Sequence, residues 1–159
     1  MYEEAVKQVE IFKDLSALQL KELYSWLERR DFPEGTMIFK EGQLPNGLYL
    51  LTEGSVTVLK GSDYGKMKLS DIEAPSFFGE MGLLNGKQRS AGIRASSNVI
   101  TGFLPADLFA TKLRGDNLTA LRIGINLGRI LCSRLSDTST KLAKKSAIMA
   151  KRRPPIGKS

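Results

Sequence analysis

The residues best suited to chemistry lie between Phe77 and Ala91, where one acid and one base frame a segment rich in glycine. Gly79 precedes a run, Glu80 to Leu84, that can form about one helical turn, and the N-terminus of such a turn offers unpaired N–H groups to an anion. Gly86 ends the run. Arg89 then supplies a planar fork of donors that suits a phosphate, so the spacing predicts a phosphate cradle.

The acid within this cradle restricts what it can hold. Glu80 would repel a phosphate unless the ligand also offered hydroxyl groups, and a nucleotide sugar fits that description. Ser90 adds a hydroxyl, and Ala91 is small enough to let the backbone come close. Two simpler interpretations stay open at this point. Glu80 and Arg89 could form an exposed ion pair worth about 0 to 1 kcal/mol, and Ser90 could be an ordinary turn hydroxyl.

Length and composition favour one domain, because 159 residues with 42% hydrophobic content can bury one good core. No apolar run approaches the roughly 18 residues of a membrane span, and the N-terminus lacks the basic and apolar regions of a signal peptide. We therefore expect a cytoplasmic protein without a membrane span. Cys132 has no second cysteine to pair with, and the absence of histidine argues against a zinc site or a histidine-based catalytic dyad.

The net charge of +7 is concentrated at the C-terminus. The remaining 17 basic residues balance 17 acidic ones, and residues 138–159 hold seven bases and no acid: Lys141, Lys144, Lys145, Lys151, Arg152, Arg153 and Lys158. We expect residues 143–159 to form a basic, flexible tail. Its charge could attract a nucleic acid backbone, anionic lipid or an acidic protein, or could simply be solvated.

The elements that must position the cradle can be outlined from local patterns. Ser16 and Gln19 form a capping box, and the helix that it starts should stop near Arg30. From Phe32 onward, short β-rich pieces alternate with glycines, which is typical of an antiparallel barrel or sandwich. The predicted strands are Met37 to Lys40, Leu48 to Thr52, Ser55 to Leu59, Met67 to Ile72, Ala91 to Ala95 and Val99 to Pro105.

Two helices should follow, Ala106 to Leu113 and Thr119 to about Met149. The long one repeats with steps of four and three, the pattern of a coiled-coil seam, at Leu121, Ile125, Gly128, Cys132, Leu135, Ser139 and Leu142. A second stripe could pack on the β body, at Ile123, Leu127 and Ile130. Gly124 and Gly128 each cost about 1 kcal/mol in a helix, and close approach of another backbone would compensate. We predict a homodimer through residues 118–142; the alternative is one broad core face on a monomer.

Residues 10 to 142 resemble the cyclic nucleotide-binding domain of the catabolite activator family of bacterial regulators. The resemblance is carried by FKDLSALQLKEL, FPEGTMIFKEG, NGLYLLTEGSVTVL, FGEMGLLNGKQRSA and LCSRLSDTS, of which the fourth is the specific one. It implies an α+β fold, an antiparallel β-roll or jelly-roll barrel flanked by an N-terminal helix and a long C-terminal dimerisation helix. The domain would span residues 1–142.

By this resemblance, Glu80 would accept the ribose 2′-hydroxyl, Arg89 would pair with the cyclic phosphate and Ser90 would bind a phosphate oxygen. Gly79 and Ala91 would contribute backbone donors. The apolar walls would be Val58, Leu69, Ile72 and Met81.

The resemblance also implies how the base is held. In activator-like relatives a Thr–Ser pair late in the long helix contacts adenine, and the serine reaches it from the partner subunit. Thr138 and Ser139 lie at the matching place in this sequence. The seam pattern separately puts Ser139 at a dimer position. The alternative is that both residues mark the fraying end of the helix. An adenine amino group can donate to hydroxyl oxygens, which favours cyclic AMP and leaves cyclic GMP open.

The expected function is therefore a non-enzymatic cyclic nucleotide receptor that regulates an unknown partner protein through a ligand-responsive dimer helix. About 17 residues follow Leu142, too few for a helix-turn-helix domain, so we do not expect sequence-specific DNA recognition unless the chain is a fragment. The alternatives are a nucleotide-independent interaction module or the sensor fragment of a longer transcription regulator. An enzyme such as a phosphodiesterase would lack histidine, metal ligands and an activated nucleophile.

Overall fold

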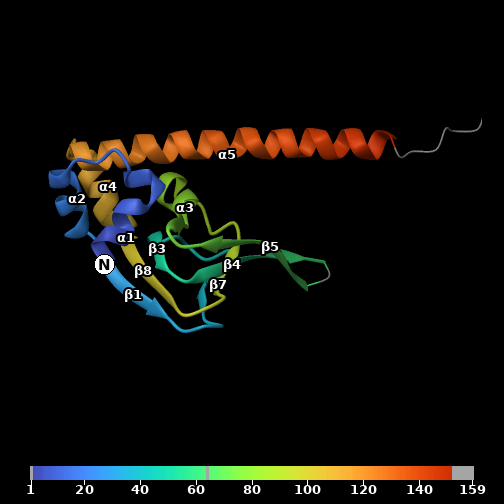
Figure 1. Cartoon of the computed structure of the whole chain (residues 1–159), viewed down its shortest axis with the longest axis horizontal. Helices are drawn as coiled ribbons and strands as arrows, with labels where there is room; N and C mark the ends of the chain where they lie inside the picture. Colours follow the sequence, from blue (N-terminus) through green and yellow to red (C-terminus); the bar gives the residue numbers. More distant parts are fainter. Residues whose placement is uncertain (1, 64, 152–159) are drawn as a thin grey trace, which may run out of the picture.

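The computed structural model describes residues 2–63 and 65–151 and has the expected α+β architecture. Two four-stranded antiparallel sheets form a β-roll, and helices from both ends of the chain gather on one side of it (Figure 1). The helices are α1 (Tyr2–Gln8), a 3₁₀ turn η1 (Glu10–Phe12), α2 (Ala17–Tyr24), α3 (Glu80–Asn85), α4 (Ala106–Arg114) and α5 (Leu118–Lys151).

The sheets are built from strands that are distant in sequence. The first has the order β1 (Glu28–Phe32), β8 (Val99–Pro105), β3 (Gly47–Glu53) and β6 (Ser76–Phe78). The second has the order β2 (Met37–Phe39), β7 (Gly92–Ala95), β4 (Ser55–Ser62) and β5 (Gly65–Glu73). Aromatic rings fill the space between the sheets, and the Tyr49 and Phe78 rings stack with centroids 5.2 Å apart. The other strands lie close to the bounds predicted from the sequence, but the short strands β1 and β6 were not predicted.

The predicted capping box is confirmed, but the predicted extension of its helix to Arg30 is wrong. Ser16 Oγ accepts from the Gln19 backbone N at 3.3 Å, and Gln19 Oε1 accepts from the Ser16 backbone N at 3.0 Å. The helix then ends at Tyr24, and residues from Glu28 form strand β1.

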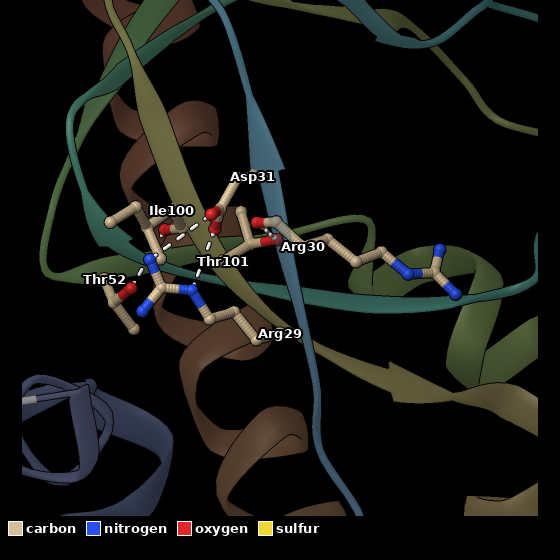
Figure 2. Close-up of polar contacts among 6 residues, drawn as sticks. All are labelled: Arg29, Arg30, Asp31, Thr52, Ile100 and Thr101. Atoms are coloured by element: carbon tan, nitrogen blue, oxygen red, sulfur yellow. Dashed lines mark hydrogen bonds and ion pairs between the residues drawn. The ribbon is translucent and has the colours of Figure 1, made fainter.

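Pairing with β8 at the edge of the first sheet determines the conformation of β1. Figure 2 shows Arg29 and Asp31 together on one side of the strand, with Nε and Oδ1 3.0 Å apart, and Arg30 on the other. The Arg30 guanidinium covers the Phe103 ring at 3.4 Å, and its backbone oxygen accepts from Thr101 Oγ1. Successive charged side chains of β1 thus point to opposite sides of an edge strand. The apolar spacing of the preceding helix does not predict this strand.

The first half of α5 is fixed to the N-terminal helices. As predicted, Ile123 and Leu127 are fully buried, in a core shared with η1, α2 and α4. Asn126 Nδ2 donates to Ile11 O at 2.9 Å and to Asp14 Oδ1 at 2.6 Å. At the start of the helix, the Glu22 carboxylate accepts from Asn117 and Thr119 side chains. These contacts hold one end of α5, whereas its second half extends past the body (Figure 1).

The predicted seam is exposed in the isolated chain. Leu121, Ile125 and Leu135 are all exposed, and outside the backbone of α5 itself a Cβ added to Gly124 or Gly128 would meet no atom of the described residues within 4 Å. Packing within the chain therefore does not require either glycine, and the homodimer stays a prediction. The helix continues through Lys151, so residues 143–151 of the expected tail are helical; residues 152–159 lie outside the described part. Among the described helices, none has the length and apolarity that crossing a bilayer would need.

Candidate functional site

The predicted helical turn is confirmed as α3, which has a glycine in the left-handed conformation at each end. Gly79 precedes it with φ 82°, and Gly86 follows it with φ 63°. A Cβ on Gly79 would lie 2.6 Å from Arg89 Nη1, so both the backbone angle and the close guanidinium require glycine here. The turn thereby brings the cassette backbone against the arginine that follows it.

Arg89 is 5% exposed and is held by neutral acceptors. Nη1 donates to Gly79 O at 2.8 Å, and Nη2 donates to Gly47 O at 2.8 Å and to Asn46 Oδ1 at 3.0 Å. Its guanidinium also lies 4.1 Å from the centre of the Phe39 ring. The group is therefore fixed in position from one side by two backbone carbonyls and one amide.

The charge of Arg89 has no anionic partner in the described part of the chain. Burial lowers the pKa of Arg89, an effect that Tyr49 and Glu80 partly offset, but an arginine stays protonated regardless. Nε–H and one of the Nη1 hydrogens have no acceptor among the described residues. A buried cation is stabilised when a counter-ion also takes up its free donors, and these two N–H groups suit a phosphate.

One cavity brings Arg89 together with most of the predicted site. Eight of the eleven predicted residues line it: Val58, Ile72, Gly79, Glu80, Met81, Arg89, Ser90 and Ala91. The other lining residues are Phe39, Phe77, Phe78, Gly82, Gln88, Ile93 and Arg134. The walls are thus largely apolar, with an acid and a base as the charged groups of the cassette, as expected of a site that orients a small polar ligand.

Glu80 is largely buried and is paired with the long helix rather than with Arg89. Its side chain is 14% exposed, and Oε1 accepts from Arg134 Nη1 at 3.3 Å. The Arg134 guanidinium also lies 4.7 Å from the centre of the Phe77 ring. Arg134 is not among the site residues predicted from the sequence. Its signal was the position four residues after Ile130, where a charge continues the stripe of α5 that packs on the body.

The remaining predicted residues differ in where they lie. Ser90 Oγ contacts Met81 Sδ at 3.8 Å, and Ser90 O accepts from Lys60 Nζ. Leu69 on β5 is 51% exposed and does not line the cavity. Thr138 and Ser139 are exposed on α5 beyond Arg134, and Thr138 Oγ1 donates to Arg134 O at 2.8 Å. The isolated chain therefore brings the cassette residues together at one cavity, and their roles toward sugar, phosphate and base stay predictions.

Curated relatives align with this region over a small share of their own length. The type II regulatory subunit of cAMP-dependent protein kinase from Drosophila melanogaster is 29% identical over 100 residues, 63% of this chain and 26% of the relative. Human cGMP-dependent protein kinase 2 is 29% identical over 111 residues, 70% of this chain and 14% of the kinase. The chain thus spans about a quarter or less of these two proteins.

Solved structures agree over more of the fold. The catabolite activator protein of Thermus thermophilus matches with a TM-score of 0.76 and 27% identity, over 86% of this chain and 63% of that one. A cyclic nucleotide-binding domain from Methylobacillus flagellatus has the same fold, with a TM-score of 0.78 at 24% identity, over 91% and 82% of the two chains. The family model of the cyclic nucleotide-binding domain matches residues 29–116, more than half of the chain and the whole of the cassette. The chain therefore belongs to the cyclic nucleotide-binding domain family.

Proposed function

We propose that the chain is a non-enzymatic receptor for a cyclic nucleotide, with cyclic AMP as the preferred ligand and cyclic GMP as the alternative. The observation that carries this proposal is the buried guanidinium of Arg89, which lacks an anionic partner in the described chain and shares one cavity with Glu80. A cyclic phosphate supplies the missing charge, and a ribose hydroxyl can donate to the carboxylate. The regulatory role is supported by two of the similar proteins, a kinase regulatory subunit and a catabolite activator protein.

The fixed side of Arg89 determines which of its donors reach the ligand. Asn46, Gly47 and Gly79 take both hydrogens of Nη2 and one of Nη1. Nε–H and the second Nη1–H remain available, and they point away from different edges of the guanidinium. A phosphate oxygen that accepts from one of these two N–H groups forms a charge-assisted hydrogen bond with the buried cation. We expect the Ser90 hydroxyl to leave its weak contact with Met81 and to bind a phosphate oxygen.

Binding of the ribose would connect the site to α5. Because Oε1 of Glu80 accepts from Arg134, a ribose hydroxyl at that carboxylate competes with, or shares, the contact that α5 makes with the cavity. A ligand that binds one arrangement of α5 more tightly than another shifts the population toward it. This is the route by which we expect the nucleotide to control the helix and, through the helix, a partner protein.

A homodimer would complete the base side of the site. The exposed seam residues and the open space around Gly124 and Gly128 are consistent with a second α5 packed against the first. Ser139 lies on this seam, so the partner's copy of that residue would reach the base, and Thr138 would act from the same chain. We expect the receptor to act in the cytoplasm, where its lone cysteine stays reduced.

Calorimetric titration with cyclic AMP and cyclic GMP tests the proposal. Wild type should bind at least one of them with measurable heat, and Arg89→Ala should bind neither. Arg94→Ala is the matched control, because Arg94 is an exposed arginine on the adjacent strand β7 and does not line the cavity. Thermal unfolding verifies that each variant folds. If wild type takes up neither nucleotide, the receptor proposal fails, and a partner pull-down unaffected by nucleotide would favour an interaction module.

A further inference from the structure

The side of α5 that faces the body changes its chemistry along the helix. Over the body it is apolar, with buried or partly buried Ile123, Leu127 and Ile130. Eighteen residues make five turns at 3.6 residues per turn, so the same side of a straight helix recurs eighteen positions later. Those positions are Lys141, Lys145 and Ile148. The helix therefore presents an apolar side over the body and a basic side in its second half. That second half extends beyond the body (Figure 1).

This basic face is open to solvent. Every described side chain from Cys132 to Met149 is exposed, and Lys144 widens the face beside Lys145. The nearest acid on the helix is Asp137, which forms no ion pair with the residues that the structure describes. The sequence adds Lys151, Arg152, Arg153 and Lys158, whose side chains lie outside the described part. The positive charge is thus carried first on a helix and continues in the sequence that follows it.

The predicted dimer seam does not use this face. Successive residues are about 100° apart around a helix, so Lys141 points about 100° away from Leu142 on the seam, and Lys145, three positions after Leu142, flanks the seam without being part of it. The seam periodicity continues through Ser146 to Met149, on the same side as Leu142. Two helices joined at the seam would leave both lysine faces accessible. A dimer would then double the charge that one partner meets.

We propose that the distal face of α5, made by Lys141, Lys144 and Lys145, binds the phosphate backbone of a nucleic acid duplex without regard to base sequence. Charge complementarity is the first argument, because the face is exposed and basic and each lysine presents a point charge suited to a phosphate. Lys141 and Lys145 lie about 6 Å apart along the axis of α5. Two phosphate steps on one strand of a duplex rise by a similar distance, about 7 Å. Residues 135–151 contain no Arg, Asn or Gln, which are three of the four side chains that make bidentate contacts with base edges.

An anionic membrane fits this helix less well. A helix that lies in a lipid surface needs a broad apolar side next to its lysines. On α5 the apolar side of the distal half is interrupted by Ser139 and Ser146, and Ile148 is the one large apolar residue on the lysine face itself. An acidic protein surface would find no buried aromatic or arginine anchor there. The backbone of a duplex needs neither an apolar side nor an anchor.

Fluorescence anisotropy of a labelled duplex of random sequence, measured across a salt series, tests this proposal. The distal variant combines Lys141→Glu, Lys144→Glu and Lys145→Glu. The matched control combines Lys7→Glu, Lys13→Glu and Lys21→Glu, three exposed lysines near the other end of the molecule, and has the same net charge. We expect the distal variant to lose more than about tenfold in affinity at low salt and the log–log salt slope to fall by about 3, at about 0.9 per phosphate contact. The control should stay within about twofold of wild type.

Several outcomes would overturn the proposal. Equal losses in both variants would assign binding to net charge rather than to this face, and an unchanged distal variant would place the contact elsewhere. Wild type that ignores the duplex at low salt but binds phosphatidylserine vesicles would assign the face to a lipid surface. Strong preference for one duplex sequence would contradict backbone binding. Circular dichroism establishes that α5 stays helical in both variants, and none of these readouts depends on nucleotide binding.

Discussion

Replacing Arg89 with methionine should separate ligand binding from folding, because two opposing terms meet at this side chain. The substitution removes three hydrogen bonds, to Gly79 O, Gly47 O and Asn46 Oδ1, and each acceptor left without a partner costs about 1 to 3 kcal/mol. It also removes the free-energy cost of burying a guanidinium that has no anionic partner in the described chain. Because Arg89 is 5% exposed, this cost amounts to several kcal/mol. Methionine keeps much of the packing against Phe39. We therefore expect the stability without ligand to change by less than about 2 kcal/mol.

The effect on binding should be much larger. Removing one partner of a buried charge pair costs about 2 to 5 kcal/mol, which is a loss of about 30-fold to several thousandfold in affinity. A ligand present at one hundred times its dissociation constant stabilises the folded state by about 2.7 kcal/mol. For a chain of 159 residues this corresponds to an increase in Tm of about 5 to 11 °C in wild type. The variant should show almost none of this increase at the same ligand concentration.

Differential scanning fluorimetry with and without cyclic AMP, together with calorimetry, measures both quantities. Arg94→Met on β7 is the matched control, because that arginine is exposed and should change neither the Tm nor the ligand-induced increase. An Arg89→Met protein that keeps the wild-type ligand-induced increase would show that phosphate binding does not depend on the guanidinium. A variant that unfolds without ligand would show that the neutral acceptors stabilise the fold more than desolvation opposes it.

Three further predictions follow from the glycine cassette, the seam and the α2–α5 junction. Gly79→Ala should lower both stability and affinity, because its Cβ would lie 2.6 Å from Arg89 Nη1. Gly86→Ala would meet no atom of the described residues within 4 Å and should cost only about 1 kcal/mol in stability, from its φ of 63°. Equal losses of stability for the two variants in thermal unfolding would contradict this. If the seam pairs two helices in parallel, mild oxidation should link two chains through the exposed Cys132. A non-reducing gel that shows monomer alone, at concentrations where light scattering detects a dimer, would rule out that pairing. The pKa of Glu22 is lowered, first by its hydrogen bond from Thr119, so this carboxylate stabilises the fold above its ordinary pKa of 4.5, and the contribution is lost as the pH falls through the lowered value. Glu22→Gln should therefore weaken the dependence of the free energy of unfolding on pH in that acidic range. An unchanged dependence on pH would disprove the assignment.

The cassette could be predicted from sequence because its geometry is local. Two glycines with six residues between them allow the left-handed backbone at each end of α3, and Arg89 follows within the same segment. Strand β1 could not be predicted in the same way, because its conformation depends on pairing with β8, about seventy residues away. The contact of Arg134 with Glu80 is also distant in sequence and is visible only as a charge at the end of an apolar stripe.

The two charged groups of the cassette therefore place different demands on a ligand. Arg89 meets no anion in the described chain, so a phosphate adds a charge pair without displacing one, and most of the affinity should come from this side. Glu80 already contacts Arg134, and a ribose hydroxyl must share or replace that contact. Because Arg134 is 47% exposed, the ion pair contributes at most about 1 kcal/mol, which changes a population ratio about fivefold. Control of α5 that is stronger than this must come from the base and from the second copy of the helix, where Thr138 and Ser139 lie.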